Sequence, residues 1–423
     1  MPLFLLLFFS NFFFLSSQYI EFPLNIEKHK FIQDDPPQKI IQSLEKINYY
    51  TLIKIGNPHK EIKFYFTFNR PEIFICSEKM KNSLYQESKS NTYKLNYNVP
   101  KEFYNGIFNE GFLSLEKFYL SNKTNNIKEI IENFNFILAT RAIYLNYHPC
   151  EIGLSLPDYY TTIEYNFINQ LKEKKLINSI IWNIKILNNN EGILVFGLLP
   201  HEYNKKDYNL NDFKNTKTIK LNTNLIWGLE FSKITIGKKN IILKQNKCKI
   251  EINSGFIIQT YEIMKEFENL FFNKYIQQNI CNKSIYNNKY FFYCNKDLKI
   301  KSFPSMSFIN KELNYIFNID YKDLFIEIYD KYYFLILFSN SELSEECILG
   351  EIFIRKFQLI FDEKNKAIGL YITINKSNFI KLMFIILLII IVFIIGLYFG
   401  LLLKKQRKIR ANELEDQFIY ESK

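Results

Sequence analysis

Short apolar or alternating runs fill the chain between residues 47 and 372. They are rich in Ile, Phe, Tyr and Val and are separated by Asn, Gly, Lys and Asp. Runs of this kind are typical of β-strands. The clearest are residues 61–66, 134–139, 179–186, 193–196, 234–243 and 357–361. The best helical patterns are residues 164–175 and 261–275. The pattern predicts a mostly β protein.

Two longer apolar stretches lie near the ends of the chain. Residues 1–17 end in small residues, which predicts a secretory signal peptide. Residues 382–403 are 22 uncharged residues that, at about 1.5 Å each, can cross the ~30 Å core of a bilayer. Basic residues begin the tail, residues 404–423, so the positive-inside rule places it in the cytoplasm. We therefore expect a single-pass type I membrane protein, with its ectodomain extracellular or in the lumen of the secretory or endolysosomal pathway.

Two polar segments connect these stretches to the body of the chain. Residues 18–46 contain the breaker Asp-Asp-Pro-Pro. Three interpretations of this segment stay open: a linker, a short pro-segment, or a first strand at residues 20–24 that docks on the body. Residues 373–381 would form a stalk before the membrane.

Composition narrows the classes of partner. The formal net charge is +11, from 54 Lys and Arg against 43 Asp and Glu, and such an excess can indicate nucleic-acid binding. However, the lysines are scattered, no basic-aromatic motif stands out, and the chain is predicted to be secreted. We therefore expect no nucleic-acid partner. Nothing in the sequence indicates an oligomeric state.

Six cysteines in a secreted chain predict up to three disulfides. Their spacings match no zinc pattern and the four histidines do not cluster with them, so we expect no metal or cofactor. Glycosylation acceptor motifs occur at Asn122 and Asn282, and a third, at Asn375, lies close to the predicted membrane.

Five segments resemble the pepsin-like aspartic peptidases, in the order and spacing of that family. They are residues 48–75, 85–93, 152–157, 191–203 and 348–371. The first contains Tyr-Tyr and Ile-Gly-x-Pro, and the last begins Ile-Leu-Gly-Glu-Ile-Phe-Ile-Arg. Tyr97 stands where the family's β-hairpin flap carries its tyrosine. The resemblance implies two β-rich lobes, residues 47–200 and 201–372, with a substrate cleft between them.

The same resemblance implies a catalytic pair of carboxylates that share a proton, one from an Asp-Thr/Ser-Gly loop in each lobe. Counting eleven residues from Gly56 reaches Thr67, with Phe68 and Asn69 at the Thr and Gly positions. Seven more residues reach Phe74, where the family has tryptophan, so the count is in register. A threonine hydroxyl stays neutral and cannot act as a general base.

The second loop has two registers within residues 248–259. Glu251 at the Asp position keeps an acid but loses the Thr-Gly that should follow it. Asn253-Ser254-Gly255 restores Ser and Gly and leaves Cys248 five residues ahead, where many family members have a cysteine. We favour the second register, in which the Asn253 amide forms hydrogen bonds but does not titrate. Either way the pair is incomplete.

Three further acids could in principle rebuild the pair, and we interpret all three as solvated surface residues. They are Glu72, Glu110 and Asp158. The resemblance also suggests a Cys76–Cys150 bridge across the disused catalytic floor, and a bridge from Cys347 to either Cys294 or Cys281.

The favoured hypothesis is a pepsin-like homologue that has lost catalysis and binds a peptide or protein in its cleft. Tyr97, Asn69, Ser254 and Gly255 would then contact the ligand. One alternative is a working aspartic endopeptidase that uses Glu251 and an unrecognised partner. Another is an inhibitor-like or adhesive surface protein that binds through its loops.

Overall fold

The computed structural model describes residues 18–372 and 387–407, apart from short gaps. The gaps are residues 29–30, 33, 97–100, 103–107, 122–127, 143–147, 158–162, 222–223, 242–245, 342–346 and 406. The predicted signal peptide, the stalk and nearly all of the tail therefore lie outside the described residues. The chain divides after Tyr371 into two compact units. All of the strands and both disulfides belong to the first unit, which thus holds its own core.

The first unit is mostly β and two-lobed, as predicted. Its largest sheet has fourteen strands. They are β1 (Ile20–Lys28), β2 (Ile47–Ile55), β3 (Lys60–Thr67), β4 (Ile73–Cys76), β5 (Lys94–Leu95), β6 (Lys101–Glu102), β7 (Phe108–Ser121), β8 (Lys128–Ala142), β9 (Cys150–Gly153), β10 (Ile181–Ile186), β11 (Glu191–Phe196), β12 (Phe213–Lys217), β28 (Ile360–Asp362) and β29 (Ala367–Tyr371). Because the last two follow the strands of the second lobe in the sequence, this sheet joins the two lobes.

The second lobe is built on a nine-stranded sheet with two smaller sheets beside it. The nine strands are β15 (Gly228–Glu230), β18 (Lys247–Ile250), β19 (Ile257–Gln259), β20 (Cys281–Tyr286), β21 (Lys289–Asn295), β24 (Phe325–Ile328), β25 (Lys331–Phe334), β26 (Ile336–Ser339) and β27 (Ile348–Leu349). The smaller sheets hold β16 (Lys233–Ile236), β17 (Lys239–Ile241), β22 (Met306–Asn310) and β23 (Tyr315–Ile319), and β13 (Ile219–Leu221) with β14 (Asn224–Ile226).

Helices are short and lie between strands. The α-helices are α1 (Pro37–Glu45), α2 (Phe167–Glu173), α3 (Pro200–Tyr203), α4 (Tyr261–Phe267), α5 (Asn273–Gln277), α6 (Tyr321–Leu324) and α7 (Glu351–Phe357). The other helical turns are η1 (Glu87–Lys89), η2 (Ile163–Tyr165), η3 (Leu210–Asp212), η4 (Glu268–Phe272) and η5 (Ile300–Ser302). Both predicted helical regions are confirmed, by η2 with α2 and by the run from α4 to α5.

Two of the predicted strands are wrong in extent. The described part of the predicted strand 234–243 is the hairpin β16–β17, which turns at Gly237 with φ +58°, a conformation that glycine adopts without cost. Residues 357–361 straddle an element boundary, because α7 ends at Phe357 and the left-handed Gln358 (φ 44°) separates it from β28. Only Phe357 of the predicted strand therefore belongs to the helix, and only Ile360 and Phe361 belong to β28.

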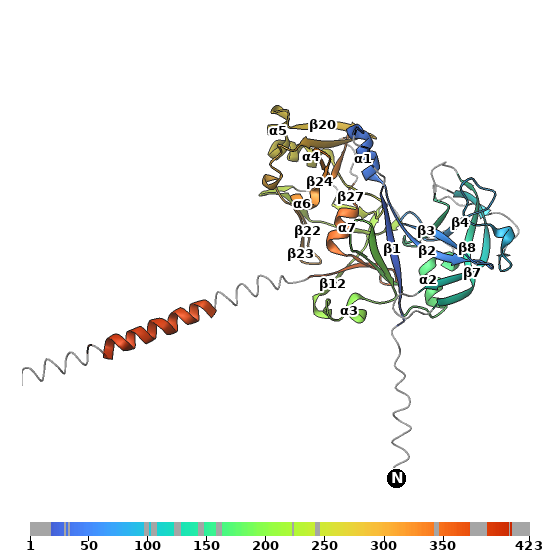
Figure 1. Cartoon of the computed structure of the whole chain (residues 1–423), viewed down its shortest axis with the longest axis horizontal. Helices are drawn as coiled ribbons and strands as arrows, with labels where there is room; N and C mark the ends of the chain where they lie inside the picture. Colours follow the sequence, from blue (N-terminus) through green and yellow to red (C-terminus); the bar gives the residue numbers. More distant parts are fainter. Residues whose placement is uncertain are drawn as a thin grey trace, which may run out of the picture. The chain divides into compact units, whose positions relative to one another are not determined.

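The polar segment before residue 47 contains both a strand and a helix. β1 lies between β11 and β2 in the large sheet, which confirms the docked-strand interpretation (Figure 1). Alternate residues of β1 are buried, from Ile20 to Ile26. The helix α1 was not predicted. It buries Ile40, Ile41 and Leu44 against the apolar face of the second lobe's sheet.

Among the described residues of the second unit, one helix is long and apolar enough to span a membrane. It runs from Leu387 to Lys405, and its side chains are exposed. It lies largely within the predicted span, residues 382–403.

Candidate functional site

The first loop begins at Thr67, the last residue of β3. Thr67 is the parallel partner of Gly153 on β9, and its carbonyl accepts the Leu154 N–H at 2.8 Å. The Thr67 hydroxyl accepts the Asn69 N–H at 3.2 Å. A Cβ at Gly153 would lie 2.2 Å from the Arg70 carbonyl oxygen, so only glycine fits under this loop. The predicted neutral hydroxyl therefore stands at a tightly packed strand end.

The second loop reaches the first through an amide. Asn253 Nδ2 donates to the carbonyl oxygens of Ile47 and Phe66, each at 3.2 Å. Phe66 immediately precedes Thr67, so the Asn253 side chain lies at the lobe junction. In return, the Asn253 carbonyl accepts the Ile47 N–H at 3.1 Å. These bonds join uncharged groups.

The acid of the second loop occupies a different place. Glu251 forms an ion pair with Lys249 at 3.0 Å and is partly exposed. In the first lobe Phe66 and Thr67 pair with Ile152 and Gly153.

In the second lobe the equivalent ladder is Lys249 with Ile348 and Ile250 with Leu349. Counting on to Gly350 aligns Glu251 with Thr67. In the second loop, the Glu251 carboxylate therefore stands at the position equivalent to Thr67, and the Asn253 amide stands at the lobe junction.

A buried ion pair lies under the first loop. Arg70 Nη2 is 2.5 Å from Glu151 Oε2, and the two side chains are 1% and 3% exposed. The Arg70 guanidinium also stacks over the Phe74 ring, 4.7 Å from its centroid. Burial raises the pKa of Glu151 and lowers that of Arg70, and each charge opposes the shift of the other. The sequence did not predict this pair, because Arg70 stands in a polar loop and nothing around it indicates burial.

The three acids interpreted as surface residues have different outcomes. Glu72 is buried, which corrects that interpretation: its backbone bridges to Asn166 at the start of α2. Glu110, on β7, is half-buried. Asp158 lies outside the described residues.

The predicted Cys76–Cys150 bridge is wrong. Both are buried free thiols. Ile75 is the antiparallel partner of Cys150, so Cys76 lies one position further along and its side chain points to the other face of the sheet. Burial raises the pKa of Cys76 to about 12 and that of Cys150 well above its ordinary value. Both thiols therefore stay neutral.

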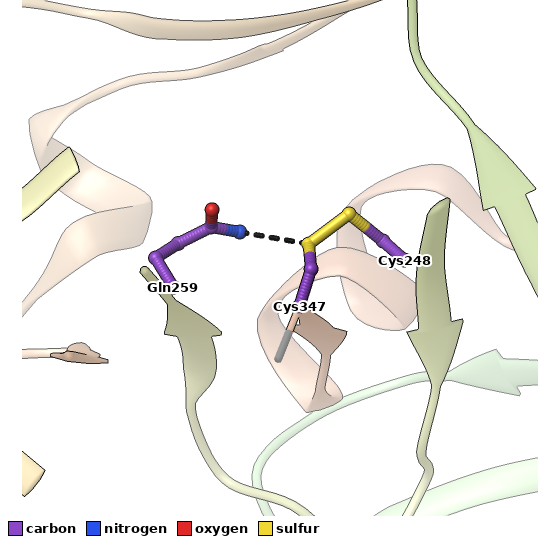
Figure 2. Close-up of a disulfide and its surroundings, with 3 residues drawn as sticks. All are labelled: Cys248, Gln259 and Cys347. Atoms are coloured by element: carbon purple, nitrogen blue, oxygen red, sulfur yellow. Dashed lines mark hydrogen bonds between the residues drawn. A yellow bond between two sulfur atoms is a disulfide. The ribbon is translucent and has the colours of Figure 1, made fainter. Parts of the chain in front are cut away.

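The pairing predicted for Cys347 is also wrong. Cys347 is bonded to Cys248, and Cys281 to Cys294. Lys249 and Ile348 are partners in a parallel ladder, so the residues before them, Cys248 and Cys347, are neighbours. Figure 2 shows this bond, with the Gln259 amide donating to the Cys347 sulfur at 3.1 Å. Cys281 and Cys294 are direct partners in the β20–β21 hairpin.

The remaining site predictions are only partly covered by the structure. Tyr97 and Asn122 lie outside the described residues. Asn282 is exposed on β20, where an acceptor asparagine is accessible. Among the described residues, no group of three or more His, Cys, Asp or Glu is arranged to hold a metal ion.

Comparison with known proteins agrees with this architecture. A family model described as "Eukaryotic aspartyl protease" matches residues 48–371. The chain belongs to the eukaryotic aspartyl protease family. Among solved structures it is similar to conglutin gamma, a unique basic 7S globulin from lupine seeds, with a TM-score of 0.61 and 12% identity, over 84% of this chain and 95% of that one. At that identity the likeness shows the fold alone. No curated protein matches the chain.

Proposed function

We propose that this protein is a membrane-anchored member of its family that binds a peptide or protein between its lobes without cleaving it. One observation carries the proposal: the residue at the end of β3 is Thr67, and the side chain that reaches that strand end from the other lobe is the Asn253 amide. Aspartic catalysis needs two acids close enough to share a proton. Here the two groups are uncharged.

The chemistry of these groups supports binding over catalysis. A hydroxyl and an amide donate and accept hydrogen bonds at any working pH, but neither takes a proton from water. Loss of one acid-base group alone costs on the order of 10²–10⁴ in rate. The Asn253 amide is moreover committed to the Ile47 and Phe66 carbonyls, which stabilises the lobe junction.

Incubation of the purified ectodomain, residues 18–372, with denatured casein and a peptide library at acidic and neutral pH tests the proposal. We expect no cleavage that a pepstatin-type inhibitor blocks. Inhibitor-sensitive cleavage would overturn it. The matched gain-of-function variant is Thr67→Asp with Asn253→Asp, which puts a carboxylate in place of each of the two uncharged groups. Cleavage by this variant alone would attribute inactivity to the two substitutions.

A second candidate function is endopeptidase activity that uses Glu251, because this residue aligns with Thr67 in the strand ladder. If wild-type ectodomain cleaves peptide, Glu251→Gln should abolish the cleavage, while Glu312→Gln, at an exposed acid outside both loops, serves as the control. Activity retained in Glu251→Gln would reject this candidate. An inhibitor-like or adhesive role through surface loops is the third alternative. It would be favoured if substitutions at Asn69, Ser254 and Tyr97 leave ligand capture unchanged.

The proposed topology rests on the apolar helix Leu387–Lys405 and on two disulfides, which are typical of an oxidising compartment. Glycosylation at Asn282 reports the topology directly. We expect glycosidase treatment of the full-length protein to lower its apparent mass by less in Asn282→Gln than in wild type. If glycosidase treatment lowers the apparent mass of wild type and of Asn282→Gln equally, Asn282 carries no glycan. That result would remove this support for a lumenal ectodomain.

A further inference from the structure

A cavity of about 450 Å³ lies where the end of β1, α1, α6 with β24, and α7 meet. β1 belongs to the large sheet that joins the lobes, and α1, α6, β24 and α7 lie on the second-lobe side of it (Figure 1). The cavity adjoins the second loop through Ile47 and Gly255, but Thr67, Glu251 and Asn253 do not line it. It is called the α1–α7 cavity below.

The wall of the α1–α7 cavity is largely apolar. The apolar residues are Phe31, Leu44, Ile47, Phe325, Ile326, Leu335 and Ile352. The neutral polar side chains are Ser43 and Asn189, and Asn189 already accepts a hydrogen bond from Arg355 at 2.8 Å. Such a wall suits a hydrocarbon body. It does not suit a peptide, whose amides need many hydrogen-bond partners when buried.

The charged residues of the cavity are unevenly balanced. Four are basic, Lys28, Lys322, Arg355 and Lys356, and two are acidic, Asp323 and Glu351. Glu351 is shared by Lys28, at 3.0 Å, and Arg355, and Asp323 pairs with Lys356. Within the part of the chain that the structure describes, no partner is recorded for the Lys322 ammonium. The cavity therefore has an excess of positive charge.

A buried hydroxyl lies close to the same charges. Tyr49 is on the same face of β2 as Ile47, which lines the cavity, and it is fully buried. Among the described residues its hydroxyl has no hydrogen-bond partner. Burial raises its pKa, and the charges of Glu351 and Arg355 act on it as well. Tyr49 itself is not among the residues that line the cavity, so a ligand in the cavity would not contact it.

We propose that the α1–α7 cavity binds a small amphipathic anion, a carboxylate with a hydrocarbon chain of about twelve carbons. At about 30 Å³ for a water-sized group, the cavity holds on the order of fifteen such groups. The carboxylate takes the place next to Lys322, Lys28 and Arg355, and the chain covers the apolar wall. A phosphate ion would leave that wall wet, and an amine would meet the excess of positive charge.

Calorimetric titration of the ectodomain with dodecanoate, below its micelle concentration, tests this site. We expect saturable binding of one dodecanoate per chain, and no saturable binding of butanoate or dodecylamine at the same concentrations. Binding of dodecylamine as strong as that of dodecanoate would overturn the proposal, as would the absence of saturable dodecanoate binding.

Two variants locate the site. Ile326→Trp fills the cavity and should weaken dodecanoate binding at least about tenfold, while Ile316→Trp, at an exposed position on β23, should leave it unchanged. Lys322→Glu should weaken it about tenfold and Lys238→Glu should not. Lys322 is a surface residue, so its substitution does not threaten folding. Wild-type affinity in both Ile326→Trp and Lys322→Glu would overturn the assignment.

Discussion

The two lobes contain the same three-strand arrangement and hold it together differently. In the first lobe β3 pairs in parallel with β9, and β9 pairs antiparallel with β4. In the second, β18, β27 and β19 repeat this pattern. In each lobe the ladder of the two parallel strands leads to a glycine, Gly153 or Gly350. A cysteine, Cys150 or Cys347, stands three residues before that glycine.

The difference is on the facing strand. Counting back along the ladders, Cys347 faces Cys248 and is bonded to it, whereas Cys150 faces Phe64 and stays a thiol. The second lobe is thus held by a covalent bond, and the first by the buried ion pair Arg70–Glu151 and by packing. A cysteine at an equivalent position does not make a disulfide unless the neighbouring strand supplies the other sulfur.

The largest expected effect is loss of the second lobe's bond. Because 99 residues separate Cys248 from Cys347, the pair Cys248→Ala and Cys347→Ala should lower the free energy of unfolding by about 4–5 kcal/mol. Urea unfolding measures this. The matched change in the first lobe, Cys150→Ala, removes only a thiol and should cost about 1 kcal/mol. Equal losses in the two lobes would contradict the comparison.

The next effect concerns the first lobe. Removing one partner of its buried ion pair, as in Glu151→Leu, leaves the Arg70 charge buried and should cost about 3–5 kcal/mol. The double change Glu151→Leu with Arg70→Met removes both charges and should cost clearly less than the sum of the single changes. A double-mutant cycle on unfolding free energies decides this. Additive losses would mean that the two side chains do not interact.

A third effect joins the lobes and depends on pH. Glu363 follows β28 and is buried, and Asn169 on α2 donates to it at 3.2 Å. Burial raises its pKa from 4.5 to about 7, against the smaller opposing effects of Lys366 and Asn169. The native state therefore holds the proton more tightly than the unfolded chain. The stabilisation of the folded state that comes from this tighter proton binding is fully present below pH 4.5 and is lost as the pH rises through 7.

The contribution of Glu363 to the free energy of unfolding is on the order of 3 kcal/mol. We expect the unfolding free energy to fall between these pH values in wild type and to fall less in Glu363→Gln. Glu312→Gln, at another acid of the second lobe, is the control. The same pH dependence in wild type and Glu363→Gln would show that another group is responsible.

The smallest effects are at the loops themselves. Asn253→Ala removes two inter-lobe hydrogen bonds and should cost about 1–2 kcal/mol. Thr67→Ser keeps the hydroxyl that accepts the Asn69 N–H but removes a buried methyl, which should cost about 0.8 kcal/mol. Thermal unfolding measures both. A larger loss at Thr67 than at Asn253 would reverse the roles assigned to the two loops.

The fold could be predicted because several motifs at family spacing fix the order of strands and turns. The count from Gly56 to Thr67 depends on local spacing along one hairpin, and it places Thr67 at the end of β3. The disulfides could not be predicted in this way, since each requires knowing which residues are opposite each other on neighbouring strands. Cys248 and Cys347 become neighbours only through the β18–β27 register.

Two further features were hidden for different reasons. The helix α1 has nine residues and begins at the second of two prolines, so its apolar positions are too few to show a period. The Arg70–Glu151 pair joins residues far apart in the sequence, and charge alone does not reveal burial. The hydrogen bonds from the Asn253 amide to the Ile47 and Phe66 carbonyls could not be predicted either, because they depend on how the two lobes meet.

The position of β1 also has a consequence for synthesis of the protein. β1 is the first of the described strands to be synthesised, yet its neighbour β11 begins only at Glu191. At about 5–20 residues per second, the ribosome needs on the order of ten seconds to make the residues between them. During that time one edge of the apolar strand Ile20–Lys28 has no pairing partner. A chaperone that holds extended apolar segments would protect the nascent chain most at this stage.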